Sequence, residues 1–306
     1  MERLRAKKNF NLNLMPHCLD MFPEVDTRQL PAVQGEVELV FSMLFPEADG
    51  AFIPRCFRWT EQFFSGQYPG YQVIDALYHD LEHTLQGTLA LVRLWRGAHL
   101  AAARPELTPR MFELGLLAIL MHDTGYLKHS DDLAGTGAKY TLTHVRRSGE
   151  FAQAFLSEKG YAPHDITAVQ NMIRCTGVNA DLTAIPFGSD LERVTGFALG
   201  TADLLGQMAA RDYVDKLPVL YAEFAEAARF NEGAPAKSIQ FASADDMMRQ
   251  TPAFWDNYVR PKIEQDFGGL FRFLADPFPD GPNYYINCVE ANLAQLRRMP
   301  AAVPAR

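Results

Sequence analysis

The sequence lacks the marks of a membrane-spanning or secreted protein. No run of 18 or more apolar residues is present, and the N-terminal stretch MERLRAKKNF has no apolar signal region. The chain has four cysteines, which show neither a C-x-x-C spacing nor the pattern of a disulfide framework: Cys18, Cys56, Cys175 and Cys288. We therefore expect a cytoplasmic protein that makes no membrane contact and keeps its cysteines reduced.

An excess of basic residues is also missing. The chain has 29 Lys and Arg residues against 37 Asp and Glu residues, which gives a formal net charge of −8. A nucleic-acid surface normally needs a basic face that neutralises phosphates. The composition therefore argues against nucleic acid as a partner.

Alternating strand patterns and internal repeats are absent as well, so the sequence predicts an all-α fold. The 48% hydrophobic content supports a substantial core. We expect a helical lead-in over residues 1–64, a core over residues 65–230 and a helical extension over residues 231–306 that starts with the loop NEGAPAK. These parts are expected to pack as one compact unit. The extension could form a lid or a dimer surface, so the sequence is compatible with a homo-oligomer.

Metal-ligating residues are present, and they lie inside apolar segments. In LTPRMFELGLLAILMHDTG, Thr108 and Pro109 predict a helix start, and the apolar run that follows predicts a buried helix. Its end places His122 beside Asp123, with Gly125 available to stop the helix. Because a buried carboxylate without a partner is costly, Asp123 needs a cation or strong donors. A metal ion would meet that need.

A second buried carboxylate is predicted at Asp203. Ser189 and Glu192 form an S-x-x-E capping box that starts a helix, and Asp203 lies in the apolar run of that helix. Charged residues are rarely buried without a partner. The alternative to a metal is a structural salt bridge to Arg211 or Arg147.

Two histidines stand four residues apart in YHDLEH. We expect one helix from about residue 71 to residue 100, with His79 and His83 on the side opposite its main apolar stripe, pointing into an interior cleft. Imidazole and carboxylate are ligands of Zn, Fe, Mn or Mg. Together with His122, Asp123 and Asp203, this pair therefore indicates a divalent-metal site, and such sites commonly catalyse hydrolysis.

The order of these elements resembles the HD-domain metal-dependent phosphohydrolases. H-x-x-x-H is followed by HD in an apolar helix and by a later Asp in another apolar helix. The segment from Tyr78 to His83 is similar to the Y-H-N-x-x-H signature of the cyclic-nucleotide phosphodiesterase branch, with Asp80 in place of Asn. The resemblance covers roughly residues 65–230 and implies an HD-domain helical bundle with N- and C-terminal helical extensions.

The resemblance also implies roles for single residues. His83, His122, Asp123 and Asp203 would bind the metal, and His79 would donate a proton to the leaving oxygen. The phosphodiesterase branch has a further histidine four residues after its HD pair begins, and the wider superfamily has Lys in its HD-x-G-K pattern at that place. This chain has Tyr126 there, so the general HD assignment is the firmer one.

Further residues are candidates for the same cleft. In some HD proteins a histidine placed like His144, at a helix start, binds a second metal ion. Asp203, Gln207 and Arg211 share one predicted helical stripe. The candidate substrate contacts are Gln207, Arg147, Lys128 and Arg211, since Arg in particular suits phosphate.

These observations predict metal-assisted hydrolysis of a phosphoester with one or two divalent ions, Zn, Mn, Fe or Mg. The partner would be a small phosphorylated substrate, a nucleotide or another small molecule, and His79 would be the general acid. Two alternatives remain open. One is an HD-type di-iron oxygenase, which would need more histidine ligands than we can place. The other is a non-catalytic module that senses a nucleotide.

Overall fold

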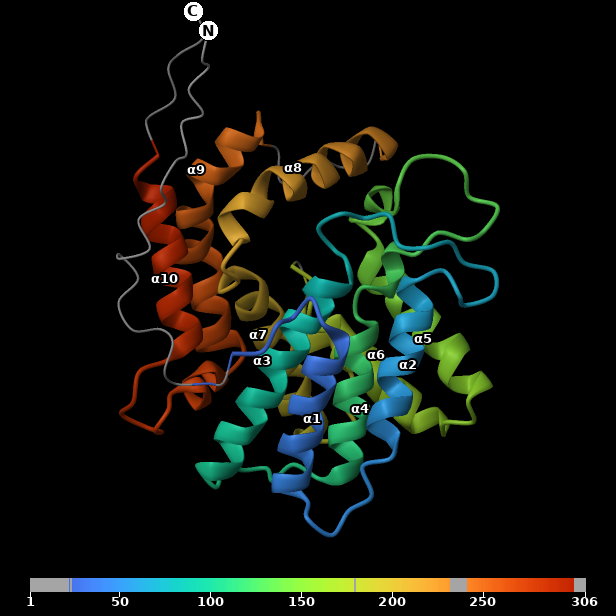
Figure 1. Cartoon of the computed structure of the whole chain (residues 1–306), viewed down its shortest axis with the longest axis vertical. Helices are drawn as coiled ribbons and strands as arrows, with labels where there is room; N and C mark the ends of the chain where they lie inside the picture. Colours follow the sequence, from blue (N-terminus) through green and yellow to red (C-terminus); the bar gives the residue numbers. More distant parts are fainter. Residues whose placement is uncertain (1–21, 23, 179, 232–240, 300–306) are drawn as a thin grey trace, which may run out of the picture.

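The chain is helical throughout the part that the structure describes. The computed structural model describes residues 22, 24–178, 180–231 and 241–299, and Figure 1 shows the helices in order along the chain. They are α1 Leu30–Leu44, α2 Phe52–Phe64, α3 Leu81–Leu100, α4 Pro109–Met121, α5 His144–Glu158, α6 Pro163–Arg174, α7 Asp190–Met208, α8 Tyr213–Phe230, α9 Ala244–Phe254 and α10 Tyr284–Arg297. The described residues form no strand beyond two isolated bridges. The all-α prediction is confirmed. Within the same residues, no helix combines the length and apolar character needed to cross a bilayer.

The predicted helix starts at α4 and α7 are confirmed. The Thr108 side chain accepts a hydrogen bond from the Met111 backbone N–H at 3.2 Å, with proline as the next residue. Ser189 likewise accepts from the backbone N–H of Glu192 at 3.1 Å. The Glu192 carboxylate accepts in turn from the backbone N–H of Gly188 at 2.8 Å. Both starts satisfy N–H groups that a helix leaves free.

The predicted start of the histidine helix is wrong. We expected one helix over residues 71–100 that carried both His79 and His83. The structure begins α3 immediately after Asp80, whose carboxylate accepts a hydrogen bond from the His83 backbone N–H at 2.9 Å. Asp is a strong N-cap, and this cap ends the preceding irregular segment. His83 therefore lies in the first turn of α3, whereas His79 lies before the helix.

The centre of the bundle is formed by α3, α4 and α7, which pack against one another. Gly206 of α7 lies directly over α3, because a Cβ atom there would stand 2.8 Å from the backbone carbonyl of Gln86. No side chain fits at that distance. The backbones of α3 and α7 are therefore held unusually close near the ends of the helices that carry His83 and Asp203.

Other helices surround this centre. α1 packs on α3, α2 on α4, α6 on α4 and α7, and α5 on α6. α9 contacts α8, and α10 contacts α7, α8 and α9. Figure 1 shows α9 and α10 side by side on the left of the bundle and α8 running from beside α9 across the top of the view. Helices from the predicted lead-in and extension thus contact the helices of residues 65–230 directly. The predicted loop NEGAPAK falls, after Asn231, outside the described residues.

Candidate metal centre

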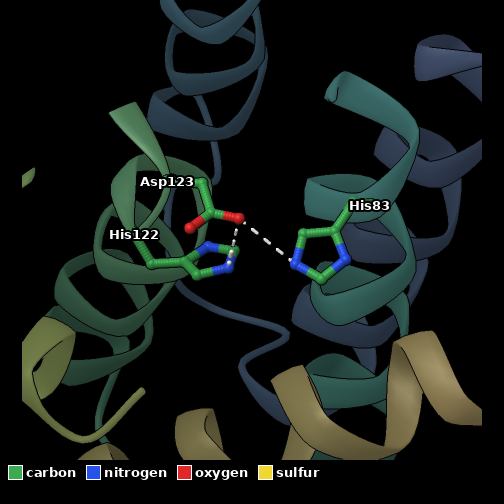
Figure 2. A group of neighbouring side chains, drawn as sticks. All are labelled: His83, His122 and Asp123. Atoms are coloured by element: carbon green, nitrogen blue, oxygen red, sulfur yellow. Dashed lines mark ion pairs between the residues drawn. The ribbon is translucent and has the colours of Figure 1, made fainter. Parts of the chain in front are cut away.

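Four of the predicted ligands meet between α3, α4 and α7. Nε2 of His83 lies 3.2 Å from Oδ2 of Asp123 and 3.3 Å from Oδ1 of Asp203. Nε2 of His122 lies 3.2 Å and 3.4 Å from the same two oxygens. Figure 2 shows one oxygen of the Asp123 carboxylate joined by dashed lines to a nitrogen of each imidazole, His83 from α3 and His122 from the end of α4. All four residues are buried.

Hydrogen bonding fixes the orientation of the His122 ring. Its Nδ1 lies 2.7 Å from the backbone oxygen of Ile119, so this nitrogen carries a hydrogen and the neutral ring keeps a lone pair on Nε2. Nε2 of His122, Oδ2 of Asp123 and Oδ1 of Asp203 are buried and form no hydrogen bond. Electron-rich atoms that face one another in a dry gap repel unless positive charge lies among them. The site must therefore hold protons or a metal cation.

The spacing of the ligand atoms fits a single ion. Atoms bound to Zn at about 2.0–2.1 Å in a tetrahedron stand roughly 3.4 Å apart. The four contacts between imidazole nitrogens and carboxylate oxygens span 3.2–3.4 Å. The ligand atoms of His83, His122 and Asp123 all lie within 4.8 Å of one another, whereas Asp203 contacts both imidazoles from outside this group. This buried group can hold a metal ion.

The two arginines that could have formed a structural salt bridge with Asp203 have other partners. Arg211 pairs with Glu24, 2.9 Å away, and its side chain is 60% exposed. Arg147 donates to the backbone oxygens of Gly125 and Leu127 at 2.7 and 2.8 Å. Among the described residues, the cationic groups paired with Asp203 are the imidazoles of the cluster.

His144 reaches the same cluster because α5 starts very close to the HD turn. A Cβ atom at Gly125 would lie 2.0 Å from the backbone oxygen of His144, so glycine is required there for this approach. Nε2 of His144 then lies 3.8 Å from Oδ1 of Asp123. Its Nδ1 is 2.6 Å from the backbone oxygen of Thr141, which directs Nε2 toward the carboxylate. His144 thus adds a third imidazole at the edge of the cluster.

Tyr126 contacts the two other histidines of the site, His79 and His144. Its ring stacks on His79 with centroids 4.4 Å apart and an interplanar angle of 11°, and on His144 at 4.7 Å and 21°. The residue that departs from both HD patterns is therefore part of the site wall. The centroids of the two imidazole rings are themselves only 6.1 Å apart, so all three rings lie in one cluster.

Glu223 of α8 is a site residue that the sequence analysis missed. Its Oε2 lies 2.6 Å from Nδ1 of His79, and its Oε1 accepts from the Tyr78 backbone N–H at 2.7 Å. Burial alone would raise the pKa of Glu223, but the charge and hydrogen bond of His79 lower it, so the carboxylate stays ionised. The sequence feature that could have revealed it is a glutamate among the apolar positions of α8.

Of the four predicted substrate contacts, the structure places one, Gln207, in the wall of the cavity. Gln207 lines the cavity beside the cluster and accepts a hydrogen bond from the Tyr78 hydroxyl at 3.0 Å. Lys128 pairs with Asp75 at 2.8 Å instead. Arg147 is engaged by backbone oxygens and Arg211 by a surface glutamate, as described above. These three side chains are not among the residues that line the cavity, so the prediction that they contact substrate is not supported.

The cluster opens into a cavity of about 1520 Å³. Site residues in its wall are His79, His83, Asp123, Tyr126, His144, Asp203 and Gln207. The rest of the wall comes from the start of α5 and the residues before it, from α6 and the loop after it, and from α7, α8 and α9. A small molecule can therefore reach the ligand cluster and the His79 ring from one space.

Metal binding is expected to release about one to two protons per ion at pH 7. Burial disfavours the charged form of His83, but the nearby carboxylates of Asp123 and Asp203 prevail and raise its pKa to about 9. Against the same burial penalty, these carboxylates raise the pKa of His122. Each imidazole must lose this proton to bind a metal. Calorimetric titration with Zn²⁺ in two buffers of different ionisation enthalpy measures the number of protons released per bound ion. A value of zero would contradict the ligand assignment.

The stability of the metal-free protein is expected to fall as pH rises from about 6.5 to 9. A histidine whose pKa is raised in the fold stabilises it fully below the unfolded pKa of about 6.5 and loses this contribution as pH passes the folded value. For His83, with a folded pKa of about 9, the loss is about 3 kcal/mol. Thermal melts of chelator-treated protein across this pH range measure it. The metal-loaded protein serves as the control, since its imidazoles are already deprotonated.

The chain matches the family described as Npun_R2479-like over residues 70–272. This region contains every residue of the cluster, the His79–Glu223 pair and the α8 and α9 walls of the cavity. No match was found among curated proteins or among solved structures.

Proposed function

The chain belongs to the Npun_R2479-like family, and from the site within its matched region we propose that it is an HD-type, divalent-metal-dependent phosphohydrolase acting on a phosphoester of a small molecule. One observation carries the proposal. Buried acceptor atoms of His122, Asp123 and Asp203 converge without hydrogen bonds, and His79, paired with a carboxylate, lines the same cavity.

The metal would be held by His83, His122, Asp123 and Asp203. When bound, a divalent cation supplies Lewis acidity, which stabilises negative charge on a phosphoryl oxygen and makes water more acidic. The protein's part is to fix the ligands. Ile119 orients the His122 ring, and the Asp80 cap holds the first turn of α3, which carries His83.

His79 is the proposed general acid. Its Nδ1 donates to Glu223, which leaves Nε2 as the nitrogen that can carry a proton for the substrate. In the hydrolysis, the oxygen of water forms a bond to phosphorus and the bond from phosphorus to the leaving oxygen breaks. His79 gives its proton to that oxygen, and the water releases one proton. An imidazole held by a carboxylate suits this transfer near neutral pH.

His144 decides whether one ion or two are used. Oδ2 of Asp123 faces the nitrogens of His83 and His122, whereas Oδ1 of the same carboxylate is the atom nearest His144. Asp123 could therefore serve two ions from its two oxygens. We propose one tightly held ion at the buried cluster and a weaker second ion at His144, whose side chain is 20% exposed.

Metal content and turnover of a generic phosphodiester test the proposal together. Protein stripped with a chelator is reloaded with Zn, Mn, Fe or Mg and assayed on bis-p-nitrophenyl phosphate. We expect at least one ion per chain by elemental analysis and p-nitrophenolate release that depends on the ion. Iron-dependent oxygen consumption without phosphoester turnover would instead indicate the oxygenase. Metal binding without either activity would indicate a sensing module.

A further inference from the structure

The cavity is larger than the reacting groups require. Its volume of about 1520 Å³ exceeds the roughly 300–1,000 Å³ typical of small-molecule sites. The ligand cluster forms only part of its wall. The remainder must face the part of the substrate that does not react.

That remaining wall is largely apolar. It includes Leu204 and Met208 of α7, Leu217, Leu220 and Phe224 of α8, and Met247 of α9. Leu142 and Val178, which also line the cavity, are 47% and 42% exposed. Apolar surface therefore continues from the interior to the solvent-exposed edge, where an apolar group could enter.

Three polar side chains of this wall are already engaged within the protein and so offer little to a nucleobase or a sugar. The Thr251 hydroxyl, the Asn231 amide and the Gln170 amide each donate to a backbone carbonyl oxygen, at 2.9, 2.7 and 2.9 Å. Recognition of a base or sugar depends on donors aimed at the ligand. These donors are already used within the protein.

The charges are equally unsuited to a substrate with several phosphates. Apart from the cluster, the charged side chains among the described lining residues are Arg146, Glu150, Arg174 and Asp181, and all four are exposed. They sum to zero, and Arg146 is paired with Glu150. A second phosphate inside the cavity would thus lack a buried cation, which is costly.

We propose that the substrate is a phosphoester of a long alkyl or alkenyl alcohol. Its phosphate lies at the ligand cluster, and its single apolar chain lies along the wall formed by α7, α8 and α9. Water adds across one P–O bond of this ester, as in the general reaction. This inference rests on the proposed phosphohydrolase function and names its substrate class.

A series of alkyl 4-nitrophenyl phosphates tests directly whether the protein binds an alkyl chain of the substrate. We expect kcat/KM of the metal-loaded protein to rise about fourfold for each methylene that becomes buried, from the ethyl to the octyl ester, below micelle-forming concentrations. Thymidine 5′-(4-nitrophenyl phosphate), which has a polar group of similar size, should be slower than the octyl ester. Equal rates along the alkyl series, or a thymidine ester faster than the octyl ester, would overturn the inference and leave the phosphohydrolase proposal standing.

Failure of the proposed function gives a different result, namely no turnover of any ester by the metal-loaded protein. Binding then still tests the apolar wall. Calorimetry should show dodecyl phosphate binding at least 100-fold more tightly than ethyl phosphate, a conservative value given about fourfold per buried methylene. Equal affinity of the two phosphates would refute an apolar chain site.

A pair of matched variants on α8 tests where the alkyl chain of the substrate lies. Ala225 lines the cavity, whereas Ala222 is exposed on the same helix and outside the lining. Ala225→Trp should reduce the ratio of octyl to ethyl kcat/KM about tenfold or more, because the indole fills space equivalent to several methylenes. Ala222→Trp should leave that ratio as in the unmodified protein. An unchanged ratio in both variants would contradict the placement along α8.

Discussion

Replacing Asp123 by asparagine is expected to empty the metal site and reduce phosphoester turnover to background. The amide keeps the shape of the side chain but removes the charge that His83 and His122 both face at 3.2 Å. Metal affinity should fall by more than the roughly 10- to 100-fold that loss of a group supporting a ligand costs. Elemental analysis after dialysis measures occupancy, and the 4-nitrophenyl esters measure rate.

The same substitution should also remove the stabilisation that metal confers. An ion present at about 100 times its dissociation constant stabilises the native state by about 2.7 kcal/mol. Asp165→Asn is the matched control, because Asp165 is a buried carboxylate outside the cavity that pairs with Arg110. It should lose some stability and keep its metal. Full metal occupancy in Asp123→Asn would refute the ligand assignment.

His79→Ala and His83→Ala are expected to fail in different ways. His83 faces both carboxylates of the cluster, so its loss should release the metal. His79 pairs with Glu223 instead, so its loss should leave the metal bound and cost roughly 10²- to 10⁴-fold in rate. Metal content and kcat/KM of the purified variants separate the two outcomes.

Leaving-group dependence gives His79 a sharper test. A good leaving group such as p-nitrophenolate needs little protonation, so the defect of His79→Ala should shrink on 4-nitrophenyl esters compared with simple alkyl esters. His164→Ala, at a side chain that is 82% exposed, is the control for replacing a histidine. If His79→Ala and His83→Ala lose metal equally, both imidazoles are ligands, and the proton donor must be sought at His144, which also lines the cavity.

The parts that sequence reasoning anticipated rest on local signals. Thr108 and Ser189 cap helices through bonds to residues three positions ahead, so short sequence patterns are enough to predict them. The prediction of the His and Asp cluster rested on a different physical constraint. A carboxylate in an apolar helix needs a positive partner wherever the chain folds, and this held for Asp123 and Asp203, both now seen facing imidazoles.

The errors come from competition between signals and from contacts distant in sequence. The apolar periodicity before Asp80 favoured a longer helix, but the cap of α3 prevailed. The partner of His79 is Glu223, 144 residues away in the chain. Lys128 follows the HD turn closely and Arg147 lies in α5, yet Lys128 pairs with Asp75 and Arg147 bonds backbone oxygens, partners that only the tertiary fold brings near.

Gly206 connects the packing of α3 and α7 to the proposed metal site. It lies one turn beyond Asp203, and Gln86, whose backbone it touches, lies one turn beyond His83. The gap of 3.3 Å between Nε2 of His83 and Oδ1 of Asp203 therefore lies close to a point where two helix backbones are in contact. A calcium ion, whose ligands stand about 2.3–2.6 Å away, needs its ligand atoms farther apart than zinc, whose ligands stand at about 2.0–2.1 Å. We therefore expect the close packing of the two helices, which lies outside the coordination sphere, to disfavour larger cations at the proposed site.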